Sequence, residues 1–132
     1  MEKLITSITH VALKCNGKAQ HDKAIKFYTE VLGLKILRTW GENDNTATMI
    51  DTGNGIIEIF SDAKEDLNYG IIYHLALATN DVDECIKRVK QAGFEVTKEP
   101  TDITIPSNPP YPARIAFCKG AANEEIEFFM QK

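Results

Sequence analysis

The chain has few cysteines, and their spacing excludes a disulfide framework. Its 132 residues include three cysteines, Cys15, Cys85 and Cys118. Three is an odd number and no two of them form a CxxC pair, so the sequence also argues against a thiolate zinc site. None stands in a setting that would activate a nucleophilic thiol. These features are typical of a reduced protein, and we expect a cytoplasmic location.

Long apolar runs and blocks of positive charge are also missing. No run approaches the roughly 18 apolar residues of a membrane span, and the N-terminal segment lacks the apolar core of a signal peptide. Fifteen Lys and Arg residues stand against 19 Asp and Glu, a formal net charge of −4. We therefore expect no membrane partner and no nucleic-acid partner, since both favour clustered positive charge. Motifs for phosphate binding (GxGxxG and the P-loop) and for hydrolases (GxSxG) are absent as well.

What the chain does have is one pattern of elements that occurs twice. The first copy predicts a strand, a helix and three strands, at residues 4–14, 20–32, 34–40, 46–51 and 55–60. The second copy predicts a strand at 71–79, a helix with the apolar stripe Val82, Cys85, Ile86 and Val89, and strands at 94–99, 113–118 and 125–130. Gly33 and Gly93 stand where the two helices would end.

An internal repeat usually means that each copy cannot bury its apolar face alone. We therefore predict an α+β fold of two tandem β-α-β-β-β modules, with four-stranded sheets and with the helices on their outer faces. The predicted boundaries are module 1 at about 4–61, a linker at 62–70 and module 2 at about 71–131, all within one domain of residues 1–132.

Four residues do not suit the strands that contain them. Glu58 and Glu127 each stand in the middle of an apolar strand, where carboxylates are rare, and His10 and His74 lie in the opening strand of each copy. Two imidazoles and two carboxylates would bind a divalent transition metal. The plainer interpretation is that each is a solvated side chain on a half-exposed strand. Their repetition at corresponding positions of both copies favours one shared site.

Two further features have plain structural interpretations. His21 stands beside Asp22 at the start of the first predicted helix, and we expect it to be solvated. The proline-rich stretch at 105–112 is interpreted as a rigid loop beside a pocket or, equally, as a stiff surface connection.

The segment KFYTEVLGLKILRT at 26–39 resembles the helix-to-strand hallmark of the glyoxalase I branch of the vicinal oxygen chelate superfamily. The strings THVALK, IIEIF, YHLAL and IEFF also stand in the order of that family's ligand-bearing strands. The resemblance covers about residues 5–131. It implies paired β-α-β-β-β modules that form cupped mixed β-sheets around a metal, with four ligands: His10, Glu58, His74 and Glu127.

The resemblance also implies a reaction. A hemithioacetal, formed from a thiol and a 2-oxoaldehyde such as methylglyoxal, would be isomerised to a 2-hydroxyacyl thioester by proton transfer through a metal-bound enediolate. Glu127 is the expected base and Glu58 the second candidate, because a carboxylate that leaves the metal can reach both carbons. The implied assembly is a homodimer with one divalent metal per site, Ni or Co being favoured and Zn possible.

Two positions depart from the family's pattern. Lys14 stands where members that use glutathione commonly have an Arg, and Asp62 where they usually have an Asn. We expect both residues, together with Arg114, to contact the aldehyde-thiol substrate. These departures leave the identity of the thiol open.

Other functions within the superfamily stay as alternatives. One is another metal enzyme, a methylmalonyl-CoA-type epimerase or an extradiol-type dioxygenase. A second is a non-catalytic protein that sequesters a ligand and confers resistance. Glu58 favours the isomerase, because the epimerases usually carry an amide at this position and the dioxygenases lack its carboxylate.

Overall fold

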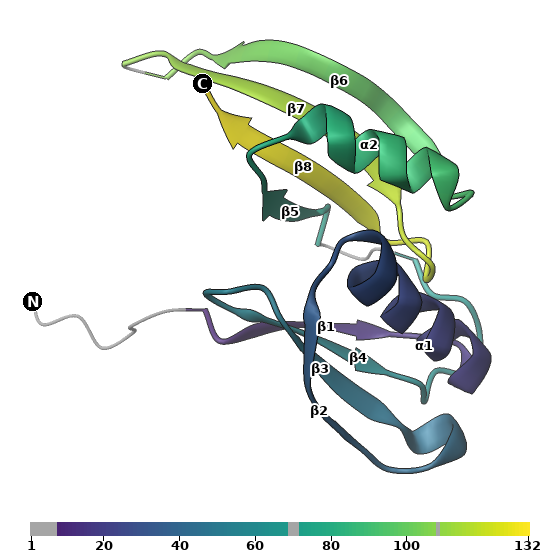
Figure 1. Cartoon of the computed structure of the whole chain (residues 1–132). Coiled ribbons are helices and arrows are strands. Elements are labelled where there is room, and N and C mark those ends of the chain that lie inside the picture. Colours follow the sequence, from purple (N-terminus) through teal and green to yellow (C-terminus); the bar gives the residue numbers. More distant parts are fainter. Residues whose placement is uncertain (1–7, 69–71, 108) are drawn as a thin grey trace, which may run out of the picture. The chain divides into compact units, whose positions relative to one another are not determined.

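The structure is a computed structural model that describes residues 8–68, 72–107 and 109–132 (Figure 1). It divides into two compact units, Met1–Asp66 and Leu67–Lys132, which we call module 1 and module 2. No helix among the described residues is long and apolar enough to cross a membrane.

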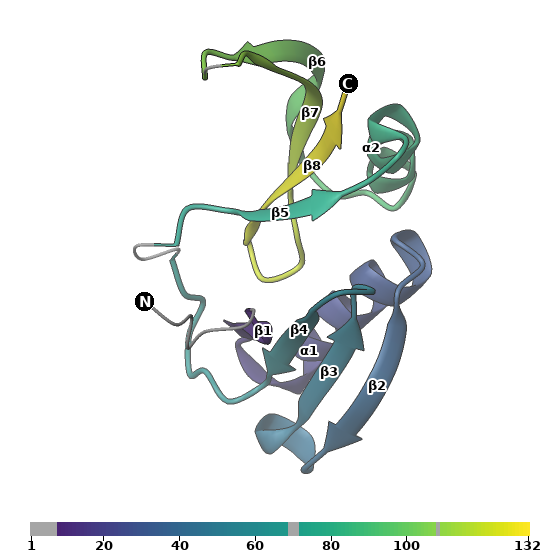
Figure 2. The ribbon, with the colours of Figure 1, turned by 90° about the vertical axis from the view of Figure 1, so that its left-hand side faces the viewer.

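Module 1 contains a helical segment and a four-stranded mixed sheet. Its elements are β1 (His10–Lys14), α1 (Gly17–Lys26), the π-helix η1 (Phe27–Val31), β2 (Lys35–Trp40), the 3-10 helix η2 (Asn43–Asn45), β3 (Ala47–Asp51) and β4 (Ile56–Phe60). The strand order is β1-β4-β3-β2. β1 and β4 pair in parallel and the other pairs are antiparallel. Figure 2 shows this order, with α1 against one face of the sheet.

Module 2 repeats the arrangement. Its elements are β5 (Leu75–Ala78), α2 (Val82–Gln91), β6 (Val96–Ile105), β7 (Tyr111–Lys119) and β8 (Glu125–Gln131). The strand order is β5-β8-β7-β6, and the parallel pair is again the first strand with the last. The predicted α+β fold of tandem β-α-β-β-β modules is confirmed. The boundaries at 61, 62–70 and 71, and the assignment of 1–132 to one domain, stay predictions.

In each module the helix covers one face of the sheet, and the candidate glutamate lies on the other face. In module 1 the helical residues Ala24, Phe27 and Tyr28 are buried together with Ile57 and Ile59 of β4. Burying a side chain of this size stabilises a fold by about 1.5–3 kcal/mol. Successive residues of a strand point to opposite faces, so Glu58 lies on the face away from α1.

Module 2 follows the same rule. The N-cap residue Asp81 accepts a hydrogen bond from the backbone N–H of Glu84 (2.9 Å), which starts α2. On β8, Ile126 and Phe128 are buried, and the intervening Glu127 lies on the other face. We call the sheet face that carries Glu58 or Glu127 the His-Glu face of its module.

The first helix differs from its prediction at both ends. It begins at Gly17 rather than at residue 20, because the carboxylate of Asp44 in η2 accepts a hydrogen bond from the backbone N–H of Lys18 (2.8 Å). At its C-terminal end the chain widens into η1, where the N–H of Leu32 donates to the carbonyl of Phe27 (3.1 Å). An N-cap supplied from 26 residues away in the chain is invisible to local spacing.

The strands β6 and β7 are longer than predicted, and the interpretation of 105–112 as a loop is wrong at both ends. Ile105 pairs with Tyr111 in the ladder. Prolines are tolerated here because Pro100 lies at a register shift of the edge strand β6, and Pro112 lies beyond the last pair that β7 forms with β8. The opening strands are shorter than the predicted 4–14 and 71–79: β1 begins at His10 and β5 at Leu75, so His74 lies directly before its strand and not within it. Residues 4–7 and 71 of these predicted strands, and residue 108, lie outside the described residues.

Candidate metal centre

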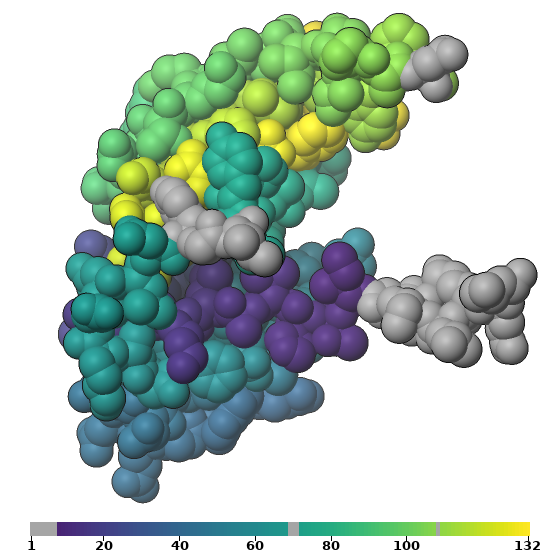
Figure 3. All heavy atoms as spheres, turned by 180° about the vertical axis from the view of Figure 1, so that it is seen from behind, coloured from purple at the N-terminus to yellow at the C-terminus, as the bar shows by residue number. Residues whose placement is uncertain are grey.

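His10 and Glu58 form a pair on the His-Glu face of module 1. The parallel ladder places Ala12 opposite Glu58, so His10, two residues before Ala12, shares the face of the carboxylate. The Nε2 atom of His10 lies 3.7 Å from Oε1 of Glu58. The Glu58 side chain is 9% exposed, whereas the His10 side chain is 41% exposed. β1, the strand that carries His10, is purple in the space-filling view (Figure 3).

The other ring nitrogen of His10 also has a partner. The hydroxyl oxygen of Thr9 lies 2.8 Å from Nδ1 of His10. When Nδ1 carries the proton and donates to this hydroxyl, Nε2 keeps its lone pair and faces Glu58. This is the arrangement that a metal-binding imidazole requires.

His74 and Glu127 form the corresponding pair in module 2. Nε2 of His74 lies 3.6 Å from Oε1 of Glu127. Two aromatic rings lie beside this imidazole. The ring centroids of Tyr73 and Phe117 lie 4.7 Å and 5.5 Å from the centroid of the His74 ring. Nδ1 of His74 is buried and has no hydrogen-bond partner among the described residues.

The carboxylate of module 2 has a perturbed acidity. Partial burial raises the pKa of Glu127 above its ordinary value, and the nearby His74 opposes the shift. Burial disfavours the charged form, so Glu127 is a stronger base than a solvated carboxylate.

The chemistry of these two pairs fits a divalent metal. Two ligands at about 2.1 Å from one ion, at right angles to each other, lie about 3 Å apart, so each pair needs a shift of less than about 1 Å to bind one ion. Among the described residues, no three His, Cys, Asp or Glu side chains lie together as a complete site. Each module therefore supplies two of the four predicted ligands, and the four-ligand set stays a prediction.

Lys14 and Asp62, predicted to contact substrate, pair with each other in module 1. Lys14 shares the His-Glu face with His10, and its Nζ lies 3.5 Å from Oδ2 of Asp62. The other carboxylate oxygen of Asp62 is buried and has no partner in the described part of the chain. The two charges offset each other, so this end of the face offers no net charge to a thiol.

Arg114 lies elsewhere. It is opposite Met130 in the ladder and so points to the helix-covered face of module 2, away from Glu127. There it donates to both carboxylate oxygens of Asp83 (2.7 and 2.9 Å) and to Asp102 (3.1 Å). These hydrogen bonds, first of all those with Asp83, raise the pKa of Arg114. Its position connects α2 to the sheet and gives no support to the predicted substrate contact.

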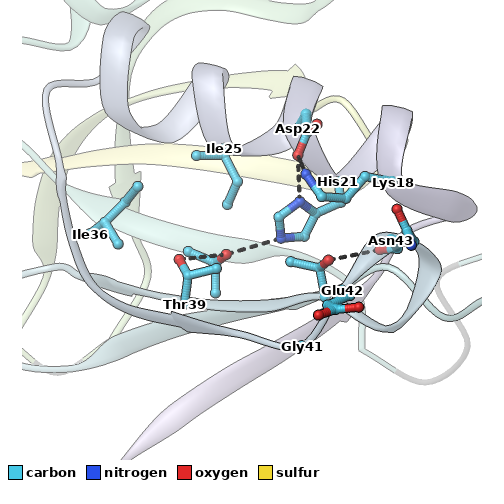
Figure 4. A pocket seen from close by; sticks show the side chains of 11 residues that line it. Lys18, His21, Asp22, Ile25, Ile36, Thr39, Gly41, Glu42 and Asn43 are labelled. Atoms are coloured by element: carbon cyan, nitrogen blue, oxygen red, sulfur yellow. Dashed lines mark hydrogen bonds and ion pairs between the residues drawn. The ribbon is translucent and has the colours of Figure 1, made fainter.

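His21 is buried, so its predicted exposure to solvent is wrong. Figure 4 shows a pocket between α1 and the β2–β3 hairpin, with His21 in its wall. Nδ1 of His21 lies 2.9 Å from Oδ1 of Asp22, and Nε2 lies 3.0 Å from the hydroxyl of Thr48. Because an ionised carboxylate only accepts, the Nδ1–H of His21 donates to Asp22, and the hydroxyl of Thr48 is the partner of Nε2. The signal was available: His21 precedes the buried residues Ala24 and Tyr28 by one and two helical turns.

The sequence matches known proteins over most of its length. Residues 7–107 match the model of the glyoxalase/bleomycin resistance protein/dioxygenase superfamily. A probable lactoylglutathione lyase of Vibrio cholerae is 31% identical over 122 residues, which are 84% of this chain and 83% of that protein. One from Vibrio parahaemolyticus is 32% identical over 100 residues, 64% of this chain and 72% of that protein. Other relatives are longer, and the chain spans 31% of a lactoylglutathione lyase of Arabidopsis thaliana.

Solved structures share the fold at lower identity. The trypanothione-dependent glyoxalase I of Leishmania major superposes with a TM-score of 0.70 at 21% identity, covering 96% of this chain and 87% of that one. TnmS3, an antibiotic binding protein from Streptomyces, superposes with a TM-score of 0.74 at 18% identity, covering 99% of this chain and 100% of that one. These structures show the shared fold, and the match over residues 7–107 shows that the chain belongs to the glyoxalase/bleomycin resistance protein/dioxygenase superfamily.

Proposed function

We propose that the protein is a glyoxalase I-type lyase, which isomerises the hemithioacetal of a 2-oxoaldehyde and a thiol to a 2-hydroxyacyl thioester. The observation that carries the proposal is the repeated pair, one imidazole Nε2 within 3.7 Å of one Glu carboxylate on the same sheet face of each module. The relatives named lactoylglutathione lyase support the same activity.

His10, Glu58, His74 and Glu127 would hold one divalent metal, with Ni or Co favoured and Zn possible. Two neutral imidazoles and two carboxylates balance the charge of such an ion, and these ligand types suit all three metals. When bound, the metal supplies a Lewis acid that stabilises negative charge on the substrate oxygens.

The proton transfer falls to Glu127, with Glu58 as the second candidate. Glu127 takes the proton from the carbon that bears the thiol and returns it to the neighbouring carbonyl carbon, while the hydroxyl proton passes to the adjacent oxygen. Substrate and product are isomers, so no oxidant or reductant is needed. The raised pKa of Glu127 supports this role, because a base acts best when its pKa lies closer to the working pH.

The test is a metal analysis of the purified protein followed by an assay with methylglyoxal. The adducts of glutathione, cysteine and cysteamine carry different charges and so also test the Lys14–Asp62 pair. We expect one bound metal per His2Glu2 set and thioester formation with at least one thiol, lost on chelation and restored by Ni or Co. A metal-loaded protein that isomerises none of the adducts would exclude the activity and leave an epimerase, a dioxygenase or a ligand-sequestering protein.

The proposal includes a homodimer in a cytoplasmic setting. None of the three cysteines forms a disulfide, which suits a reducing compartment. A four-stranded module of about sixty residues buries a small core and is only marginally stable by itself, which favours pairing of modules, either within a chain or between two chains.

A further inference from the structure

The pocket between α1 and the β2–β3 hairpin lies on the opposite face of the sheet from Glu58 (Figure 4). Thr39 and Thr48, which form part of its wall, are opposite each other in the β2–β3 ladder. Thr48 precedes Met49, which is opposite Glu58, so the two threonines point to the helix-covered face. The pocket encloses about 490 Å³, the size of a small-molecule site. It is therefore separate from the candidate metal centre.

One end of this pocket is apolar. Ile25 of α1 and Ile36 of β2 line it, and Figure 4 shows both side chains at the end away from Asn43. Ile36 is 49% exposed, so its side chain keeps apolar surface that a ligand can cover. Removing such surface from water is favourable, and this end of the pocket therefore suits the hydrocarbon part of a ligand.

The middle of the pocket offers oxygen atoms that can accept hydrogen bonds. Oγ1 of Thr39 lies 3.1 Å from Oγ1 of Thr48, which lies 3.0 Å from Nε2 of His21. A hydroxyl has one proton and two lone pairs, so the Thr39 oxygen keeps at least one lone pair whichever way these bonds run. Nδ1 of His21 and Nζ of Lys18 both donate to Oδ1 of Asp22. Among the described residues no donor is bound to Oδ2, which can accept from a ligand.

The charged side chains in the wall favour a cation. Lys18 pairs with Asp22, and Glu42 adds a second carboxylate that forms no ion pair within the described part of the chain. The hydrogen bond from Lys18 holds the pKa of Asp22 below its ordinary value, so this carboxyl is ionised at neutral pH. The start of α1 would attract an anion, but the N–H of Lys18 already donates to the carboxylate of Asp44 (2.8 Å). Acceptors and negative charge therefore dominate the polar part of the pocket.

We propose that this pocket binds a small organic cation, a primary ammonium compound with a short hydrocarbon chain. The ammonium pairs with the Glu42 carboxylate and donates to oxygen acceptors in the wall, and the chain covers Ile25 and Ile36. An ammonium group has three donors and no acceptor, which matches a wall of free oxygen atoms. The inference does not rest on the proposed function, because the pocket contains none of the four candidate metal ligands.

The test compares three probes that have the same hydrocarbon chain and differ in charge: hexylamine, hexanol and hexanoate. Each is titrated into the full chain and followed by two-dimensional amide NMR, which measures the affinity and locates the site. We expect hexylamine to bind at least about 10-fold more tightly than the other two probes, the scale of one charge-assisted hydrogen bond. The largest shifts should fall on the amides of Thr39 and Glu42.

Substitutions distinguish the two kinds of contact. Glu42→Gln should weaken hexylamine binding by about 10-fold and change hexanol binding by less than about 2-fold, because it removes only the charge. Ile36→Ala should weaken the binding of both probes by about 3-fold or more, because both chains lose the same apolar contact. Glu65→Gln is the matched control, since it removes an exposed carboxylate of module 1 that does not line this pocket. It should change neither affinity.

Several results would overturn the inference. They are the absence of hexylamine binding, binding of hexanol or hexanoate as tight as that of hexylamine, and an affinity for hexylamine that Glu42→Gln leaves unchanged or that Glu65→Gln lowers equally. Shifts centred on His10 and Glu58 would also overturn it, because they would place the cation at the candidate metal centre. Lyase activity is assayed separately, and its absence would leave a cation site in this pocket standing.

Discussion

The two candidate imidazoles differ at Nδ1, because the hydroxyl of Thr9 lies beside this atom in His10. It lies 2.8 Å from Nδ1 of His10 and can donate to this nitrogen or accept from it. The corresponding atom of His74 is buried without a partner among the described residues, and the preceding residue is Tyr73 rather than a threonine. A buried N–H without an acceptor costs about 1–3 kcal/mol. His10 is therefore better prepared to bind a metal through Nε2 than His74 is.

Replacing Thr9 by Val tests this positioning role. Partners of metal-bound histidines typically contribute about 10- to 100-fold to metal affinity, so we expect Thr9→Val to weaken metal binding by that factor and Thr9→Ser to restore most of it. Competition with a chromogenic chelator measures the affinity. Thr97→Val is the matched control, since it removes a hydroxyl bound to Glu125 (2.8 Å) rather than to a candidate ligand. Equal affinity of Thr9→Val and wild type would disprove the role.

Glu127→Gln tests the assignment of the base. The amide keeps the shape and one ligating oxygen but cannot accept a proton, so we expect the variant to retain metal while kcat falls by about 10²–10⁴-fold. Glu58→Gln should lower kcat less. Turnover and metal content are measured together for both variants. If Glu127→Gln turns over near the wild-type rate with metal bound, the base is Glu58.

Sequence reasoning was most informative for residues whose signal is repeated, whose role as ligands stays a prediction, and it failed where the partner is distant. His10 and Glu58 could be paired in advance because His74 and Glu127 repeat their placement. The contact of His21 with Thr48, 27 residues away, could not be predicted, because only the folded sheet brings this hydroxyl to the helix. The partners of Arg114 had no signal either, because a 31-residue separation from Asp83 places α2 over β7 only after folding.

At the scale of elements, the turn at Gly41 positions the segment that contacts both the start of α1 and the end of β4. Its φ of +80° lies in the left-handed region, and a Cβ at this position would collide with the backbone oxygen of Asn45. The turn positions η2, in which Asp44 caps α1 and the carbonyl of Asn43 accepts from the Ser61 hydroxyl (3.1 Å). One backbone conformation therefore supports the start of the helix and the end of β4.

Alanine substitutions at two glycines distinguish the cost of a left-handed backbone conformation from the cost of a steric clash. Gly33 has a φ of +78° with open space around it, so Gly33→Ala should lower the free energy of unfolding by about 1–2 kcal/mol, the cost of the left-handed conformation alone. Gly41→Ala adds the steric clash with Asn45 and should lower the free energy of unfolding further. Urea unfolding followed by circular dichroism gives both values. Equal losses would show that η2 moves aside freely.

The order and type of the elements were predictable from alternating apolar residues and from the glycines after each helix. Their ends were less predictable. Local patterns do not encode tertiary contacts. They therefore could not predict the π-helix η1 or the extension of β6 and β7 through the prolines. Pro112 is tolerated in β7 because it lies one residue beyond the last ladder pair with β8, where its carbonyl accepts from the N–H of Lys132 (3.0 Å).

At the scale of the whole molecule, each module carries half of the candidate ligand set, so two variants can complement each other. If module 1 of one chain completes its site with module 2 of a partner, then His10→Ala and His74→Ala are each inactive alone. Their heterodimer has one site with all four ligands. Random mixing should then restore about a quarter of the wild-type activity.

This experiment needs subunit exchange, which a brief incubation in mild denaturant followed by dilution provides. Sedimentation velocity confirms the dimer, and a mixture of wild type with the double variant His10→Ala and His74→Ala controls for dilution. A mixture of the single variants that stays inactive would place all four ligands in one chain.

The parallel pairing of first and last strands in each module also bears on how the chain folds. β1 joins the sheet only through β4, and β5 only through β8, although about 40 to 50 residues separate the partners. Closing such a long loop carries an entropic penalty before any contact offsets it. During synthesis, neither histidine can pair with its glutamate until the last strand of its module has left the ribosome. A four-ligand site would therefore form only after the last strands of both modules are complete, and a chain cut before Glu127 would lack the second pair.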